Sequence, residues 1–187
     1  MNEELIAFLP VYIDMKGNCT SLHTARGGVY NVEKSIRTVL NQLSEYFLVD
    51  LKASRKYYGE LLFVTNLVPI PFNEDNVFIP LKVRKPLCKN DGSIGYVNID
   101  YIEKLSVSNG KTIVHFKNKT TIDSLNSIET VNKHIKNGHI VKKLYIERYS
   151  SNFCREYDFY TEYNKPATKG DIAFIMHEIM EIKENIK

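Results

Sequence analysis

The dipeptide Asn109-Gly110 constrains the fold of this chain more than any other short stretch. It separates two segments, 94–107 and 111–117, that are rich in β-branched and apolar residues. A two-residue type I′ turn needs positive φ angles at both central positions, which asparagine and glycine adopt at little cost. The sequence therefore predicts an antiparallel hairpin here, and the fold has to include an antiparallel sheet.

Five other segments have the composition of strands, with apolar, β-branched and aromatic residues between turn signals. Proline marks several of them. Pro10 indicates an edge position, because proline cannot donate a ladder hydrogen bond, and Pro166 ends the last of the five. The prolines at 69 and 71 suggest that their strand leads into a loop. These strands are predicted at 5–14, 61–72, 77–81, 140–148 and 153–163.

Two adjoining segments before residue 60 show helical periodicity. In the first, which begins after Ser35, apolar residues recur at intervals of three and four from Ile36 to Phe47. A second pattern follows from Leu48 and is predicted to stop at Gly59, because glycine readily adopts the left-handed conformation found at helix ends.

Two more helices are predicted in the second half of the chain. Asp123 or Ser124 is expected to cap the first, which ends at Asn137-Gly138. Thr168 begins the last helix, which has an apolar stripe on one side and acidic residues on the other. The stripe consists of Ile172, Ile175, Met176, Ile179 and Ile182.

The order of these elements indicates the fold class. Antiparallel hairpins lie between helices, without the regular strand–helix alternation of a parallel sheet. The sequence therefore predicts an α+β fold with an antiparallel sheet, intervening helices and a C-terminal amphipathic helix. We expect one domain over residues 1–166 and the amphipathic helix over 167–187, either as part of that domain or as a dimer contact.

Composition places the chain among ordinary globular proteins. It has 187 residues, of which 43% are hydrophobic and 25% charged. No apolar run is long enough to cross a bilayer, and the acidic start does not resemble a signal peptide. The cysteines at 19, 88 and 154 are far apart and odd in number, which argues against disulfides or a structural zinc site. We therefore expect a cytoplasmic protein with free thiols and no membrane contact.

The sequence contains no recognisable catalytic motif. There is no nucleophile elbow, no phosphate-binding loop and no dinucleotide-binding fingerprint. The five histidines are scattered, and His134 and His139 are five residues apart, one more than a helical metal pair requires. We therefore predict that the protein is not an enzyme and that it binds neither a cofactor nor a metal ion.

Charge is unevenly distributed, although the formal net charge is only +3. Basic residues dominate the middle of the chain and acidic residues the two ends. The candidate DNA-binding residues fall in two groups. The first lies beside a tyrosine pair and consists of Lys52, Arg55 and Lys56. The second lies in a proline-containing segment and consists of Lys82, Arg84, Lys85 and Lys89. Four cations within eight residues are too costly to bury without partners, so they face either water or an anion. A basic surface that binds a polyanion and a merely solvated surface both remain open at this point.

If the polyanion is DNA, the mode of binding is also constrained. No helix-turn-helix, zinc finger or basic zipper is evident in the sequence. Loops or strands that carry Lys and Arg into the narrow, negatively charged minor groove fit the pattern better. Preference would then depend on A/T content and deformability more than on base edges.

A series of short motifs resembles the competence transcription factor (ComK) family. The motifs follow the family's order over roughly residues 5–137, and each is only weakly specific when taken alone. They are Ser54-Arg55-Lys56-Tyr57-Tyr58-Gly59, Val68-Pro69-Ile70-Pro71, Val77-Phe78-Ile79-Pro80, Tyr96-Val97-Asn98-Ile99-Asp100-Tyr101-Ile102, Ser108-Asn109-Gly110-Lys111 and Leu125-Asn126-Ser127-Ile128-Glu129-Thr130.

The resemblance implies a cytoplasmic transcriptional activator that binds double-stranded DNA at A/T-rich boxes through the minor groove. It also implies a homodimer or a dimer of dimers, and control by an adaptor that delivers the protein to proteolysis. The chain departs from the family pattern where Glu60-Leu61-Leu62-Phe63 stands in place of a basic glycine-arginine-lysine loop, and at Tyr96 in place of a tryptophan. The alternative is therefore a protein-interaction module that kept the fold and lost DNA binding.

Overall fold

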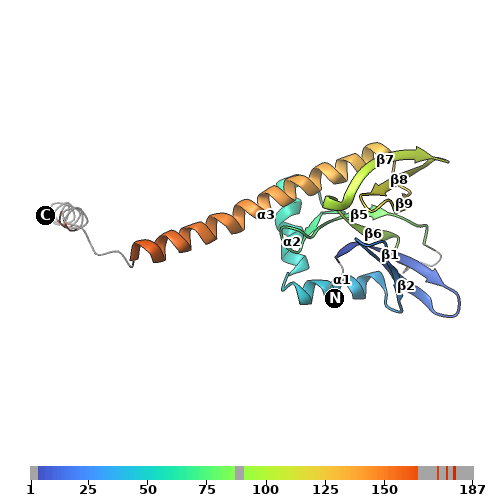
Figure 1. The fold of residues 1–187 in the computed structure, drawn as a ribbon, viewed down its shortest axis with the longest axis horizontal. Coiled ribbons are helices and arrows are strands. Elements are labelled where there is room, and N and C mark those ends of the chain that lie inside the picture. Colours follow the sequence, from blue (N-terminus) through green and yellow to red (C-terminus); the bar gives the residue numbers. More distant parts are fainter. Residues whose placement is uncertain (1–3, 87–90, 164–171, 173–175, 177–178, 180–187) are drawn as a thin grey trace. The chain divides into compact units, whose positions relative to one another are not determined.

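The computed structural model describes residues 4–86, 91–163, 172, 176 and 179. Its larger sheet contains six strands, each antiparallel to its neighbours (Figure 1). The strand order is β3-β2-β1-β6-β5-β4. The bounds are β1 (Leu5–Ile13), β2 (Gly17–Thr24), β3 (Val29–Val32), β4 (Ile70–Pro71), β5 (Val77–Lys82) and β6 (Ile94–Asn98). The predicted strands at 5–14 and 77–81 are confirmed, but the edge position indicated by Pro10 is wrong, because β1 lies between β2 and β6.

The smaller sheet is formed by β7 (Ile102–Ser108), β8 (Lys111–Phe116) and β9 (Thr121–Ser124). Asn109 and Gly110 connect β7 to β8 with φ angles of 50° and 71°, so the predicted hairpin is confirmed. The segment 94–107, however, is not one strand. A 3-10 turn, η1 (Ile99–Tyr101), breaks it, and its first part enters the larger sheet as β6.

Three helices complete the part of the chain that the structure describes in continuous segments: α1 (Ile36–Tyr46), α2 (Leu51–Leu62) and α3 (Ile128–Tyr163). The hydroxyl of Ser35 accepts a hydrogen bond from the Thr38 N–H and caps α1. Asp50 caps α2 in the same way. The α+β class is therefore confirmed, with antiparallel sheets and helices in one fold.

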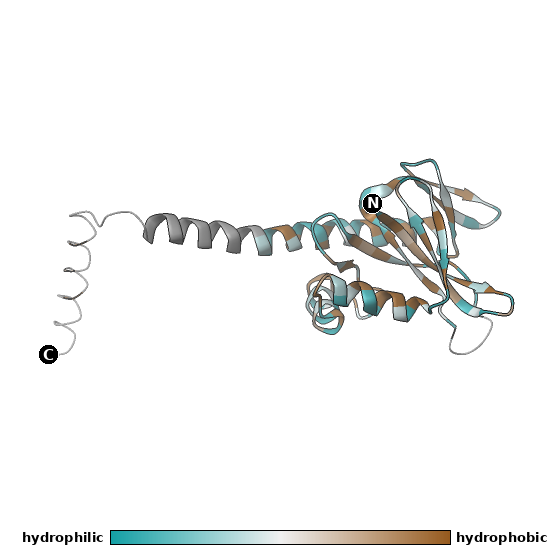
Figure 2. Cartoon of the chain, turned by 60° about the horizontal axis from the view of Figure 1, so that its bottom comes forward, coloured by the Kyte–Doolittle hydropathy of each residue, from teal (hydrophilic) through white to brown (hydrophobic). Residues whose placement is uncertain are grey.

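The central strands of the six-stranded sheet are rich in hydrophobic residues (Figure 2), and buried apolar clusters lie on both faces of the sheet. On one face Phe8, Phe72 and Phe78 form an aromatic cluster beneath α1 and the start of α2. On the other face aliphatic residues such as Ile79 and Val97 pack against the smaller sheet and the first half of α3. Alternate residues of one strand serve opposite faces, as the pleat requires.

The last quarter of the described chain corrects the sequence prediction. Residues 140–148 and 153–163, predicted as strands, belong to the single helix α3. Gly138 does not end a helix either, since α3 continues through it. A Cβ atom at this position would lie 2.7 Å from the Cγ2 atoms of both Ile79 and Ile99. The glycine is explained by this close approach of α3 to the sheet. Alternation of aromatic residues in 153–163 was misleading because helical segments can also show it by chance.

Three boundaries also differ from the prediction. Asp123 and Ser124 lie in β9, and Ser127 caps α3 instead, its hydroxyl accepting a hydrogen bond from the Thr130 N–H. Gly59 lies within α2, whose last turn continues to Leu62. Consequently 61–72 is mostly not a strand, and only its residues 70–71 pair in the sheet.

The C-terminal helix falls mostly outside the described residues. Ile172, Met176 and Ile179 are helical, and each side chain is 54% exposed. Contacts divide the chain into two compact units, residues 1–146 and 147–187. The predicted division at residue 166 stays a prediction, since it separates residues of which few are described.

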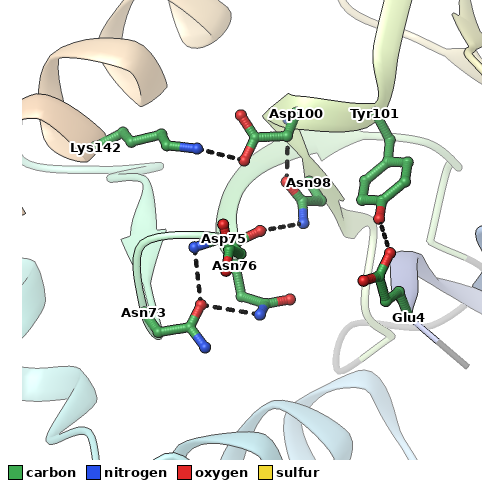
Figure 3. A network of polar contacts seen from close by, with 8 residues as sticks. All are labelled: Glu4, Asn73, Asp75, Asn76, Asn98, Asp100, Tyr101 and Lys142. Carbon is green, nitrogen blue, oxygen red and sulfur yellow. Dashed lines mark hydrogen bonds and ion pairs between the residues drawn. The ribbon is translucent and has the colours of Figure 1, made fainter. Parts of the chain in front are cut away.

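A polar network ties α3 to the loop between β4 and β5 (Figure 3). The Nζ atom of Lys142 lies 2.6 Å from a carboxylate oxygen of Asp100, whose own N–H donates to the side chain of Asn98. Asn98 is almost fully buried, and its amide donates to the carbonyl of Asp75 at 2.9 Å. The network thus satisfies a buried amide while it fixes η1 between two elements.

Replacing Gly138 with alanine tests the close approach. Alanine favours a helix interior over glycine by about 1 kcal/mol, but the new methyl group has to push apart two branched side chains, at a cost of about 1–3 kcal/mol. We therefore expect Gly138→Ala to lower the free energy of unfolding, measured by urea denaturation. The neighbouring His139→Ala, at an exposed position of the same helix, is the control and should be neutral or slightly stabilising.

The pH dependence of stability tests the environment of His134, which is 9% exposed and has no hydrogen-bond partner for Nδ1. Burial, with a smaller effect of Lys133, lowers its pKa from 6.5. The unfolded chain then binds the proton more tightly, so stability should fall as the pH drops below about 6.5. His134→Gln should flatten this dependence in denaturant titrations, whereas the exposed His139→Gln should not.

Candidate functional site: a basic groove on two helices

A groove of about 550 Å³ lies between α1, α2 and the start of β6. Its sides carry three cationic side chains, those of Arg37, Lys52 and Arg55. None of the described residues that line it is acidic. The remaining lining residues are Ile36, Leu40, Asn41, Leu51, Gly92, Ser93, Ile94 and Tyr96. A cationic rim above an apolar floor is suited to an anion that also presents apolar or ring surface.

The amphipathic pattern of α1 determines which of its side chains line the groove. Leu40 is buried against the aromatic cluster, and Ile36 packs beside it at the first turn. Arg37 and Asn41 follow one residue after each of these, so they are turned from the core toward the opening and are exposed. The fixed packing of the apolar pair therefore sets the position of the arginine.

The second helix presents its cations along one line. Arg55 and Lys56 follow Lys52 by three and four residues. The three side chains therefore share one face of α2, and all are exposed. Tyr58, by contrast, is 3% exposed within the aliphatic core. The tyrosine thus anchors the helix, which leaves the three cations directed outward.

Tyr96 connects the groove to the core. Its ring stacks on Phe8 with centroids 4.9 Å apart, and its hydroxyl lies 3.5 Å from Nη2 of Arg55. Burial raises the pKa of Tyr96, and the charge of Arg55 partly opposes this. The phenol therefore stays neutral, so it adds no negative charge beside the three cations.

A second hollow, of about 640 Å³, adjoins the other side of α2. Arg55 lines both hollows, so the helix forms a ridge between them. Lys56, Glu60 and the exposed ring of Phe63 also line this second hollow. The remaining lining residues are Gly59, Val64 and Thr65.

The cations at the end of β5 and in the loop that follows it have different roles. Arg84 is half-buried, and it donates from Nε to the carbonyl of Gly92 at 2.7 Å and from Nη2 to the side chain of Asn18 at 2.5 Å. These bonds join the two ends of the loop and fasten it to the start of β2. Lys82 and Lys85 have exposed side chains, while Lys89 lies outside the described residues.

The structure thus brings together only part of the predicted set. Lys52 and Arg55 line the same groove and Lys56 lies next to them, but Lys82, Arg84 and Lys85 do not line it. Arg37 was missed by the sequence prediction. Its signal was present, because an exposed arginine directly follows the first apolar residue of a capped helix.

Other kinds of site find no support in the part of the chain that the structure describes. No three His, Cys, Asp or Glu side chains there are grouped so as to hold a metal ion. No helix among the described residues is long and apolar enough to cross a membrane. No protein-family model, no curated protein and no solved structure matches this chain.

The distinction between Arg84 and Lys85 can be tested by stability. Arg84→Ala removes two hydrogen bonds that hold the loop, and we expect it to lower the free energy of unfolding by about 1–2 kcal/mol. Lys85→Ala, at an exposed neighbouring position, should stay within about 0.5 kcal/mol of the parent. Equal effects of the two substitutions in urea denaturation would contradict this division of roles.

Proposed function

We propose that the protein is a DNA-binding transcriptional regulator that contacts A/T-rich duplex DNA through the basic surface of α1 and α2. The observation that carries the proposal is the groove lined by Arg37, Lys52 and Arg55 without a described acidic residue. Several cations on two packed helices can contact more than one phosphate of a duplex at the same time.

The proposed binding mode is the minor groove, although the cations lie on helices and not on the loops or strands that the sequence suggested. They are distributed over α1 and α2, and α2 forms the ridge between the two hollows. Binding of this kind depends on phosphates and on groove shape, so A/T-rich DNA with its narrow minor groove is the favoured target. The motif resemblance to competence transcription factors agrees with this proposal and suggests a cytoplasmic activator that works as a homodimer or a dimer of dimers.

The decisive experiment measures affinity for an A/T-rich duplex by fluorescence anisotropy over a range of salt concentrations. Each lost phosphate contact should reduce the slope of log K against log salt by about 0.9. The triple substitution Arg37→Gln, Lys52→Gln and Arg55→Gln is therefore expected to reduce the slope by about 2–3 and to weaken binding strongly at low salt.

A matched control removes the same charge elsewhere. Lys117, Lys133 and Lys136 are exposed on β8–β9 and α3, and their combined replacement by glutamine changes the net charge equally. This variant should keep most of the parent slope. Equal losses in both triple variants would show that only net charge matters, and absence of binding by the parent at low salt would reject the proposal.

A protein-interaction module is the second candidate function. The observation that favours it is the C-terminal helix, where Ile172, Met176 and Ile179 are each 54% exposed at helical spacing. Such a stripe indicates burial against another helix. Under this function, Met176→Lys should alter the mass measured by light scattering, while the triple substitution in the groove should leave partner binding unchanged.

A further inference from the structure

Phe63 combines a left-handed backbone conformation with a fully exposed aromatic side chain. It ends α2 with φ 54° and ψ 41°, the left-handed region in which glycine is usual. Its ring is 95% exposed. The two bonds that close the helix, from the N–H groups of Phe63 and Val64 to the carbonyls of Glu60 and Gly59, involve only the backbone. Any residue could make them, and glycine would do so without strain.

The surroundings of the ring indicate its partner. Phe63 lines the same hollow as Arg55 and Lys56, which lie two turns earlier on α2. Glu60, which lies between the cations and Phe63 in the sequence, also lines the hollow and repels phosphate there. A ligand that fits has to place negative charge against the two cations and an apolar, unsaturated surface against the phenyl group.

A DNA duplex has this arrangement, because phosphates border each groove and the base stack forms its floor. Apolar side chains that enter the minor groove can insert between base pairs and kink the duplex. We propose that Phe63 is such a wedge, which inserts at one base step while Arg55 and Lys56 hold the flanking phosphates. This inference rests on the proposed DNA-binding function and adds the residue that deforms the DNA.

The test compares the parent with Phe63→Gly on a duplex that carries 2-aminopurine at successive steps and a fluorophore pair at its ends. The parent should raise 2-aminopurine fluorescence at one step and shorten the end-to-end distance. Phe63→Gly should lose both signals and bind roughly 5- to 100-fold more weakly, with an unchanged salt slope. Its thermal midpoint should rise by about 2–4 °C, because glycine relieves the strained backbone.

Two further variants keep the test specific. Phe63→Trp retains a large ring and should retain unstacking and bending. Met15→Gly removes a comparable strain, since Met15 has φ 64° and is fully exposed in the β1–β2 turn. It should raise the thermal midpoint similarly, yet leave affinity, unstacking and bending as in the parent.

The outcomes separate the wedge from the function on which it rests. If the parent binds the duplex with a salt-dependent affinity and Phe63→Gly bends it equally, the wedge is rejected and DNA binding stands. If Phe63→Gly instead changes the mass in light scattering with bending unchanged, the ring is a protein contact and the wedge is also rejected. If the parent binds no duplex at low salt, both proposals are rejected together.

Discussion

The structure depends on the two-sided burial of the central strands β1, β5 and β6. A strand that is apolar on both faces needs packing partners on each of them, and in this fold different residue types and elements cover the two faces. Aromatic residues face α1 and α2, whereas aliphatic residues face the smaller sheet and α3. At Gly138 the backbone of α3 comes so close to Ile79 and Ile99 that a methyl group would lie 2.7 Å from each and would force them to shift.

The basic groove is a consequence of this packing. Because α1 and α2 place their apolar faces on the aromatic cluster, their polar faces are fixed relative to each other, and Arg37, Lys52 and Arg55 line one opening. The stack of Tyr96 on Phe8 continues the same cluster into the wall of the groove. The left-handed backbone conformation of Phe63 is not a consequence of core packing, since the exposed ring is not part of the core and lies beside the cations.

Sequence patterns were sufficient where the responsible interactions are local. The Asn109-Gly110 turn, the apolar periodicity of α1 and the cations at one face of α2 are each set by residues within a few positions of one another. The α+β class followed from these elements. The patterns misled beyond residue 137, because a glycine that ordinarily marks a helix end was explained by contacts with residues 79 and 99, far away in the sequence.

The sequence by itself determined the hairpin, the first two helical segments and two of the three cations of the groove, Lys52 and Arg55, because periodicity and turn chemistry act over one or two turns of chain. Only the tertiary structure decided that 140–148 is helical, that Arg84 holds a loop, and that Arg37 joins Lys52. These features depend on which distant surfaces meet, and local propensity carries no information about such contacts.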